Sequence, residues 1–351
     1  LARRCFAAAA VLIFTTILGA QAVSIGTIEG RVFNARRGEY VENARITVDG
    51  SSQQVLTDST GQYRLTNIAA GTVNYLTAAS LVAAGTTIGN GVTANFRVGG
   101  DGEFGAADIA TILSLTYAGG GSTTRLGFGT VNATGGVFTL ANVIANPTGG
   151  TFAVVKNGTG TLVLSGLSTY TGGTTVNDGV LEVNTLADTV GSSLGLGTTT
   201  GITLNAGTLR FTGATGASTR PLSIATGTID VSAANGVLTL NPSSGNITTG
   251  LTKSGAGQLV IVGNNTIINP GDIEVTGGSL TFESGAALGS FGGKSININR
   301  GGSFLTWNLT TRNNAIIGLN DGSFFENQAG VLRWNGDFAV DGDTTMRQTG
   351  D

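Results

Sequence analysis

One segment of the sequence occurs twice, and each copy alternates apolar and polar residues in short runs between glycine-rich turns. The first copy spans residues 156–183 and the second spans residues 253–282. In the first copy Leu162 and Leu164 alternate with polar or β-branched residues, and glycine or asparagine follows where the alternation stops. A period of two residues is typical of β-strands, and these turn residues are typical of tight reversals. Each copy therefore predicts strands joined by turns.

The copies keep nearly the same internal spacing. Lys156 recurs as Lys253 and Val176 recurs as Val275, so two residues are inserted between the halves of the second copy. A shorter signature, a glycine followed by alternating apolar residues, begins at Gly136, Gly207, Gly227, Gly302 and Gly322. Unequal spacing of this kind is typical of a β-solenoid, whose turns vary in length while its strands stack. We predict that residues 125–351 form a parallel β-helix of about ten coils, roughly 50 Å long.

The first copy closely resembles the autotransporter-associated β-strand repeat of bacterial surface and secreted passenger proteins. The resemblance is carried by the alternating run 162–166, the turn 170–176 and the closing strand 177–183. It implies a solenoid passenger domain and, downstream, an outer-membrane barrel through which such passengers usually reach the surface. We also expect more coils and an attachment module beyond Asp351.

Within this copy the alternation assigns side chains to the two faces of the strands. Residues in one phase of the period should point into the solenoid core. These residues are Leu162, Leu164, Val176, Leu181 and Val183. Gly179 follows Asn177-Asp178 and precedes a strand, so we expect it to adopt a left-handed turn conformation.

Residues 1–22 have the pattern of a secretory signal peptide. Basic residues precede an apolar run, and Ala20 and Ala22 provide the small residues of a cleavage site. An uncleaved anchor is the alternative. Cys5 is the single cysteine and lies within this segment, so the mature chain would contain none. We expect an exported bacterial protein that passes through the periplasm to the cell surface, the outer membrane or the medium.

Residues 23–98 are predicted to form a small β-sandwich of short strands separated by glycine or asparagine turns. The segment resembles the carboxypeptidase regulatory-like domain. That pattern is carried by Gly30, Val32, Ala44, Ile46, Val48, Thr57, Asp58, Gly61, Tyr63 and Leu65. The resemblance implies a spacer or binding module without catalysis, with residues 95–98 as its last strand. Such modules often precede the plug of a TonB-dependent receptor, which gives an alternative assignment for the chain.

Residues 99–124 are predicted to link the two bodies. Asp101 and Asp108 are spaced like ligands of a calcium loop, but Arg97 and Gly99 occupy two other positions that require oxygen ligands. We therefore interpret Asp108 as the N-cap of a short helix that closes the open end of the solenoid. The apolar face of this helix would comprise Ile109, Ile112 and Leu113.

The composition excludes several kinds of chemistry. No histidine occurs, so histidine-dependent triads and histidine zinc sites are excluded, and no phosphate-binding loop sequence is present. The net charge is −3, which gives no basic surface for nucleic acid. Paired carboxylates could still act on a glycosidic bond. The nearest cluster is Asp272, Glu274 and Glu283, with Asp178, Glu182 and Asp230 elsewhere. We interpret them as solvated outward residues and expect no catalytic site, cofactor or metal.

Aromatic residues gather near the C-terminal end of the chain. They are Phe304, Trp307, Phe324, Phe325, Trp334 and Phe338. Inside the solenoid they would form stacked core columns, which is the interpretation we favour, whereas on one outer face they would offer a platform for sugar rings.

Taken together, the sequence predicts an all-β, non-enzymatic, exported surface scaffold that serves adhesion or display. Its expected partners are a surface polysaccharide or a ligand on a host or neighbouring cell. The alternatives are a β-helical polysaccharide lyase or hydrolase, and the N-terminal part of a TonB-dependent receptor.

Overall fold

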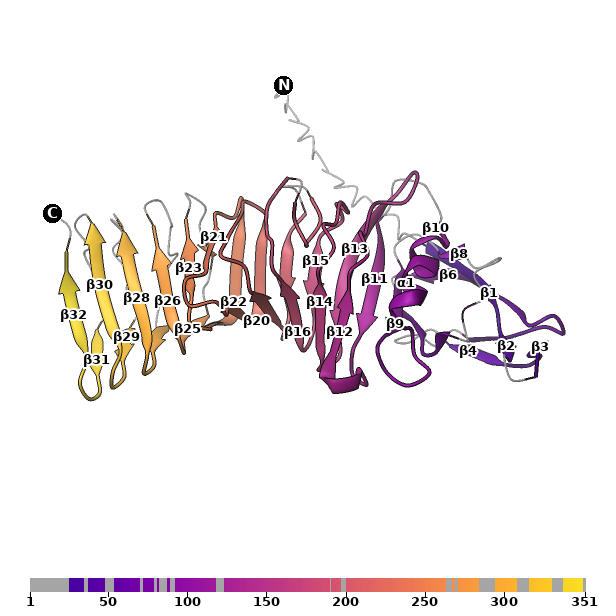
Figure 1. Ribbon diagram of the computed structural model, residues 1–351, viewed down its shortest axis with the longest axis horizontal. Coiled ribbons are helices and arrows are strands. Elements are labelled where there is room, and N and C mark those ends of the chain that lie inside the picture. Colours follow the sequence, from indigo (N-terminus) through magenta and orange to yellow (C-terminus); the bar gives the residue numbers. More distant parts are fainter. Residues whose placement is uncertain are drawn as a thin grey trace, which may run out of the picture.

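The computed structural model shows a rod of stacked strands with a smaller β region at one end (Figure 1). The structure describes residues 25–34, 37–47, 54–69, 72–78, 81, 87–88, 92–117, 123–189, 191–196, 200–262, 267–268, 271–283, 294–307, 316–329 and 337–349. The predicted signal peptide lies outside these residues. Within them, no helix is long and apolar enough to cross a membrane.

The N-terminal β region contains one four-stranded sheet. Its strands are ordered β10 (Thr116–Tyr117), β8 (Thr87–Ile88), β1 (Ile25–Arg31) and β6 (Gln62–Ala69). Strand β1 is antiparallel to β6 and to β8. Two short antiparallel pairs accompany the sheet, β2 (Phe33–Asn34) with β3 (Glu39–Tyr40) and β4 (Arg45–Thr47) with β5 (Gln54–Leu56). Gly30 lies opposite Tyr63, and a Cβ atom at Gly30 would be 2.7 Å from the tyrosine oxygen, so glycine lets the ring cross β1.

The rod is built from parallel strands that stack in three ladders, one for each side. The first ladder comprises β7 (Thr72–Tyr75), β9 (Thr93–Arg97), β11 (Thr123–Gly129), β13 (Thr151–Asn157), β15 (Thr174–Val176), β17 (Ile202–Leu204), the first halves of β20 (Leu222–Val231) and β22 (Gly245–Ser254), and β24 (Ile267–Ile268). The two long strands continue into the second ladder, so the side of the rod turns there without a break in the strand.

The second and third ladders form the remaining sides. The second comprises β12 (Val137–Leu140), β14 (Thr161–Leu164), β16 (Val180–Val183), β18 (Thr208–Phe211), the second halves of β20 and β22, β25 (Asp272–Val275), β27 (Ser295–Ile298), β29 (Ile316–Leu319) and β31 (Phe338–Val340). The third comprises β19 (Thr215–Ser218), β21 (Val237–Leu240), β23 (Gln258–Ile261), β26 (Gly278–Phe282), β28 (Gly302–Trp307), β30 (Phe324–Ala329) and β32 (Thr345–Gln348). The predicted fold class is confirmed, with about ten solenoid turns after the N-terminal β region.

Apolar side chains in register fill the interior of the rod. Leu162, Leu181, Leu209 and Ile229 occupy successive coils of the second ladder, and none of them is exposed. Full burial of such a side chain contributes about 1.5–3 kcal/mol, and each coil shares this core with its neighbours. The predicted inward residues are confirmed, because Leu162, Leu164, Val176, Leu181 and Val183 are all at most 1% exposed.

The strand expected to end the sandwich, residues 95–98, instead belongs to the rod. Strand β9 pairs in parallel with β7 and β11 of the first ladder. Phe96 lies in register with Phe128, and its ring stacks on Tyr75 at 5.0 Å between centroids. These aromatic contacts inside the first coils explain the pairing, since the same alternation would have suited a sandwich edge. The predicted domain boundaries remain a proposal.

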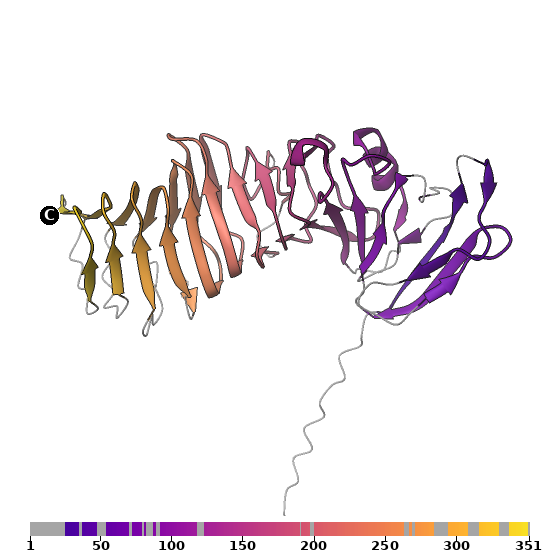
Figure 2. The same ribbon diagram turned by 90° about the horizontal axis from the view of Figure 1, so that it is seen from below.

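A short helix, α1 (Ala106–Leu113), lies beside the first coils, between the rod and the N-terminal β region (Figure 2). Its N-cap is Gly105 rather than the predicted Asp108. Asp108 stands at the third helical position, where its carboxylate accepts a hydrogen bond of 2.8 Å from the Gly105 N–H. A carboxylate there serves the helix start as well as a cap would. Ile109 and Ile112 are buried in the core of the first coils, so the helix covers apolar residues at this end.

Candidate functional site

The first copy of the repeat buries a lysine at the end of β13. Lys156 has no exposed surface, and its Nζ donates to the carbonyl oxygens of Asn157 at 3.0 Å, Gly158 at 2.5 Å and Asp178 at 3.1 Å. The first carbonyl is at the end of β13, the second is in the turn that follows, and the third belongs to the turn of the next coil. The ammonium group therefore bridges two stacked turns.

The second copy repeats this arrangement. Lys253 Nζ donates to the carbonyl oxygens of Ser254 at 2.6 Å, Gly255 at 3.0 Å and Gly277 at 3.0 Å. Burial lowers the pKa of both lysines to about 8, against the attraction of Asp178 in one copy and Asp230 in the other. The sequence analysis missed this lysine clamp, although the recurrence of lysine at the same place in both copies was a signal for it.

A glycine sits opposite each clamp in the next coil. Gly179 has a φ of +64° and Gly278 has a φ of +59°, so the predicted left-handed turn at Gly179 is confirmed. A Cβ atom at Gly179 would collide with the carbonyl oxygens of Gly158 and Gly160 and would lie 2.8 Å from the Lys156 ammonium. Lysine and glycine together let the two turns lie in contact.

The two clamps occupy different corners of the rod. In the first copy the clamped turn joins β13 of the first ladder to β14 of the second. In the second copy it joins β22, within the second ladder, to β23 of the third. The repeat therefore forms a corner of the solenoid, and the two copies form different corners.

A row of asparagines runs along the outside of the first ladder. Its members are Asn74, Asn95, Asn157, Asn177 and Asn205. Each amide Nδ2 donates to the Oδ1 of the preceding member, at 2.7, 3.0, 2.8 and 2.7 Å along the row. Between Asn95 and Asn157 the row crosses β11, where Gly127 and Gly129 lie opposite them. A Cβ atom at Gly127 would be 2.6 Å from Asn95 Oδ1, so the missing side chain allows the crossing.

The asparagine row borders a groove of about 470 Å³ on the outside of the rod. We call it the asparagine groove. It is lined by Asn74, Thr93, Asn95, Arg125, Val155, Asn157, Thr175 and Asn177. Amide and hydroxyl groups dominate this lining, with one guanidinium group and no carboxylate. The sequence analysis did not identify it, because its members come from five strands that only the stacking brings together.

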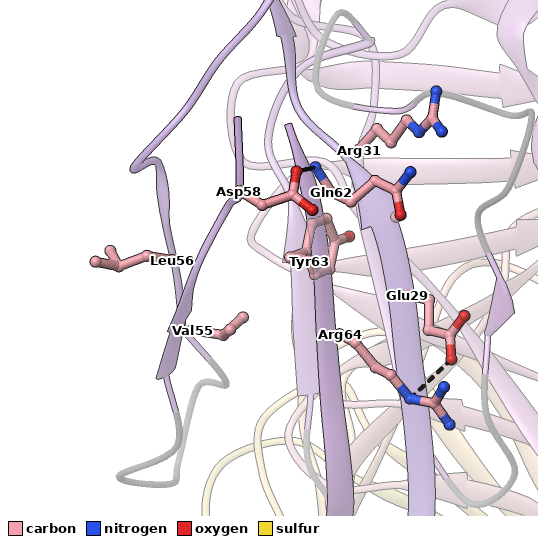
Figure 3. Close-up of a pocket in the computed structure, with 9 residues that line it drawn as sticks. Glu29, Arg31, Val55, Leu56, Asp58, Gln62, Tyr63 and Arg64 are labelled. Carbon is pink, nitrogen blue, oxygen red and sulfur yellow. Dashed lines mark hydrogen bonds and ion pairs between the residues drawn. The ribbon is translucent and has the colours of Figure 1, made fainter. Parts of the chain in front are cut away.

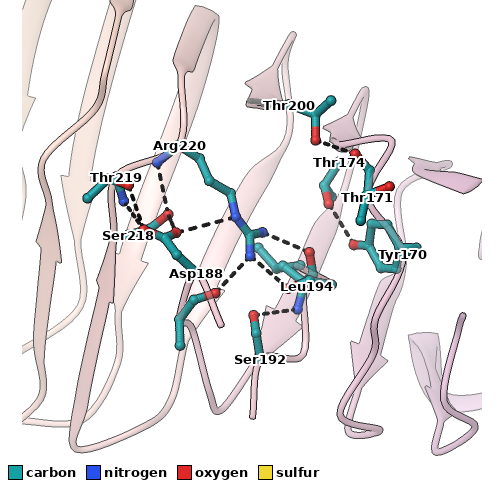
Figure 4. Close-up of polar contacts among 12 residues, drawn as sticks. Tyr170, Thr171, Thr174, Asp188, Ser192, Leu194, Thr200, Ser218, Thr219 and Arg220 are labelled. Atoms are coloured by element: carbon teal, nitrogen blue, oxygen red, sulfur yellow. Dashed lines mark hydrogen bonds and ion pairs between the residues drawn. The ribbon is translucent and has the colours of Figure 1, made fainter. Parts of the chain in front are cut away.

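A buried arginine holds the loop between β16 and β17 (Figure 4). Arg220 donates to the carbonyl oxygens of Leu194 at 2.8 Å, Ala187 at 2.7 Å and Gly195 at 2.7 Å, and its Nε lies 3.5 Å from Asp188. Burial would raise the pKa of Asp188, but hydrogen bonds from Thr219 and Ser218 hold it below its ordinary value. The network ties three backbone carbonyls and a carboxylate to one guanidinium, so its role is to fix the loop.

The N-terminal β region contains a cavity of about 480 Å³ between β5 and the β1–β6 pair. Val55 points into the space, and Glu29 pairs with Arg64 at 2.9 Å (Figure 3). Asp58 accepts hydrogen bonds from Thr60 and from the Gln62 backbone, and these lower its pKa. Three of the charged groups that line the cavity, Glu29, Arg64 and Asp58, therefore already have partners, and the Arg31 guanidinium lies over the Tyr40 ring at 5.2 Å.

Five of the carboxylates considered in the sequence analysis have partners in the structure: Asp178, Glu182, Asp230, Asp272 and Glu274. Asp272 accepts from the Ser295 N–H at 2.8 Å, and Glu274 accepts from the Asn299 amide at 2.6 Å. Glu182 and Asp230, which are distant in sequence, flank Arg210 on successive coils at 3.5 and 3.0 Å. No group of three acidic side chains in the described part of the chain could hold a metal ion.

The residues that were compared with a calcium loop in the sequence analysis, and judged not to form one, have other contacts. Arg97 lies 3.9 Å from Glu103, whose carboxylate also accepts from the Gly100 N–H at 3.1 Å. Asp108 belongs to the start of α1, as described above. Asp101 is exposed. The loop therefore places Arg97 beside the Glu103 carboxylate and does not gather a set of oxygen ligands there.

Two of the six aromatic residues near the C-terminal end, Phe304 and Phe325, lie in a core column of the kind favoured in the sequence analysis, whereas Phe324 is half-buried. Phe282, Phe304 and Phe325 occupy successive coils of the third ladder, with 5.7 Å between neighbouring ring centroids. Phe304 and Phe325 are buried, whereas Phe338 is 37% exposed and packs against Phe325 at 5.6 Å. Trp334 lies outside the described residues.

Comparisons with known proteins agree with this architecture. Residues 154–183 and 251–285 match the family model described as Passenger-associated-transport-repeat. The chain carries passenger-type repeats. Residues 27–99 match the Carboxypeptidase regulatory-like domain. Both resemblances drawn from the sequence are confirmed.

One curated relative is the adhesin BmaC autotransporter of Brucella suis biovar 1 (strain 1330). It is 32% identical over 238 residues, which is 61% of this chain and 7% of that protein. The chain therefore spans a small part of the relative's length. No solved structure gave a significant match. The similarities support a secreted, cell-surface or outer-membrane-associated location, and they fit a non-enzymatic surface passenger rather than a lyase or a receptor.

Proposed function

We propose that the chain is a non-enzymatic passenger scaffold, exported through the periplasm and held at the bacterial surface for adhesion or display. The observation that carries the proposal is the pair of passenger-type repeats, each closed by a buried lysine, within a continuous parallel solenoid. Stacked coils hold outward side chains in fixed columns along the rod. Such columns suit attachment through many weak contacts. An outer-membrane transport module in the whole protein, and a ligand on a polysaccharide or on another cell, are parts of this proposal.

The carboxylates support a non-enzymatic role. A general acid needs a carboxyl group with a raised pKa, set across a cleft from a second carboxylate. Glu182 and Asp230 share Arg210, and Asp272 and Glu274 accept hydrogen bonds from side chains of the neighbouring coil. These contacts tie the carboxylates to side chains of neighbouring coils, which is a structural use of the groups.

The test compares bacteria that carry the whole gene with bacteria whose gene lacks residues 125–351. We expect the deletion to abolish attachment to cell monolayers and polysaccharide-coated surfaces, while protease treatment of intact cells still detects the rest of the protein outside. Equal attachment by both strains would refute the adhesive role. Release of reducing sugars from a polysaccharide by the purified chain would refute the non-enzymatic role.

A further inference from the structure

The asparagine groove differs from the other hollows of the molecule in what its lining leaves available. In the N-terminal cavity Glu29 is paired with Arg64, and in the hollow beside Asp188 the carboxylate already receives Ser218 and Thr219. The carboxylates of both hollows are therefore already engaged by neighbouring side chains. Three asparagines that line the asparagine groove, Asn95, Asn157 and Asn177, have hydrogen-bonding capacity to spare.

The spare capacity follows from the amide geometry. An asparagine amide carries two N–H donors and an oxygen with two lone pairs. Asn95, Asn157 and Asn177 each donate once to the preceding member of the row and accept once from the next. One donor and one lone pair remain on each, and all three side chains are half-buried at the groove. Thr93 and Thr175 add hydroxyl groups, which also donate and accept.

A surface that offers donors and acceptors side by side matches a ligand built of hydroxyl groups. A carboxylate accepts but cannot donate, and an ammonium group donates but cannot accept. Asn157 ends β13, and Asn177 and Asn205 directly follow β15 and β17. These adjacent strands of the first ladder are about 4.8 Å apart along the rod, a step close to the length of one sugar ring. Val155, whose side chain is 5% exposed, provides an apolar floor for the C–H face of a ring.

We propose that the asparagine groove binds a segment of neutral polysaccharide, lying along the rod with its hydroxyl groups on the asparagine row. The row fixes each amide before binding, so little side-chain freedom is lost when the sugar arrives. This inference rests on the proposed adhesive function and assigns that function a ligand class and a place.

The test uses Thr175 with a matched control in the next coil. Thr175 lines the groove, whereas its register partner Thr203 does not, and both side chains are half-buried on the outside of the first ladder. The variants are Thr175→Val, Thr175→Trp, Thr203→Val and Thr203→Trp, prepared in the full chain and checked by thermal unfolding. Titration calorimetry with cellohexaose, xylohexaose, chitohexaose and the acidic hexagalacturonate measures binding.

We expect at least one neutral hexasaccharide to bind and hexagalacturonate not to bind. Loss of one hydrogen bond in Thr175→Val should weaken binding roughly three- to tenfold, and the indole of Thr175→Trp should abolish it by filling the groove. Both Thr203 variants should bind like the wild type. The proposal is overturned by tighter binding of hexagalacturonate, by equal losses at both positions, or by no binding of any neutral probe. If bacteria that carry the Thr175→Trp gene still attach, the proposal that the asparagine groove is the binding site is refuted, and the adhesive function is not.

Discussion

The contact between stacked turns can be tested at Gly179, where two separate costs of a side chain can be distinguished. Gly179→Ala would impose a left-handed conformation on a residue with a Cβ atom, which costs about 1–2 kcal/mol. It would also force that atom against two carbonyl oxygens and the Lys156 ammonium of the coil below. Overpacking of this kind costs about 1–3 kcal/mol more. We therefore expect a total destabilisation of about 2–5 kcal/mol.

Gly135 provides a matched control for the backbone cost alone. Its φ is +68°, close to that of Gly179, but a Cβ atom there would have no neighbour within 4 Å. Gly135→Ala should therefore cost only about 1–2 kcal/mol. Gly278→Ala, at the equivalent place in the second copy, should behave like Gly179→Ala, because its Cβ atom would meet the carbonyl oxygens of Gly255 and Gly257.

Hydrogen exchange with mass spectrometry suits this comparison, because coils of a repeat protein open locally and a single global unfolding transition is not assured. The quantity compared is the opening free energy of residues 156–183 for Gly179→Ala, of 253–282 for Gly278→Ala and of 123–140 for Gly135→Ala. If all three variants lose the same opening free energy, the stacked turns are not in contact and the clamp geometry is wrong.

The remaining predictions concern the core, the lysines and the loop clip. Leu181→Asp places an unpaired charge in the shared core and should cost more than about 4 kcal/mol. Val180→Asp, on the half-exposed side of the same strand, should cost less than about 1 kcal/mol. Urea unfolding followed by circular dichroism compares the two variants, and similar midpoints would contradict the inward assignment of Leu181. The pKa of Lys156 and Lys253 is about 8 in the fold and 10.5 without burial, so the unfolded chain binds more protons between these values and the free energy of unfolding should rise with pH across that window, relative to the Lys156→Met/Lys253→Met double variant. A relative fall in melting temperature from pH 7 to 9.5 would contradict this sign. Arg220→Met removes the donor to three carbonyls and the charge that pairs with Asp188. This should cost about 3–5 kcal/mol and expose residues 184–196 to limited proteolysis, and an unchanged cleavage pattern would show that the loop is held by other contacts.

The confirmed predictions rest on local sequence patterns that give the same structure whichever strands become neighbours. A period of two fixed which face of a strand turns inward, and Leu181 is therefore buried as expected. The sequence Asn177-Asp178-Gly179 specified a turn that a left-handed glycine completes. Neither inference needed to know which strand would lie next to which.

The same period of two also placed Lys156 inward, in phase with Phe152 and Val154. The signal was present, but a charged residue at the end of a strand is usually solvated, and its partners are backbone carbonyls that leave no trace in the sequence. The assignment of β9 failed for a related reason. The alternation of Ala94, Phe96 and Val98 suits either kind of sheet, and the choice depends on stacking against Phe128, in a later coil.

The asparagine groove could not be predicted from the sequence, because it requires the register of five stacked strands of the first ladder. Asn95 and Asn157 are 62 positions apart and meet across a strand in which Gly127 lacks a side chain that would collide with Asn95. An asparagine after a strand reads as a turn residue, which is also true of Asn177 and Asn205. Their shared column becomes visible only when the coils are stacked.

The shift of the repeat from one corner to the next connects the fold to its use. The clamp consists of an inward lysine side chain, backbone carbonyls of two stacked turns and a left-handed glycine, so it uses no outward-facing side chain. Coils can therefore be held in register at the corners while the outward residues differ from side to side. The first side carries the asparagine row, and the second carries the ion pairs of Glu182, Arg210 and Asp230. Because stability resides in the corners and the interior, the outer faces of such a rod can change their ligand without a change of fold.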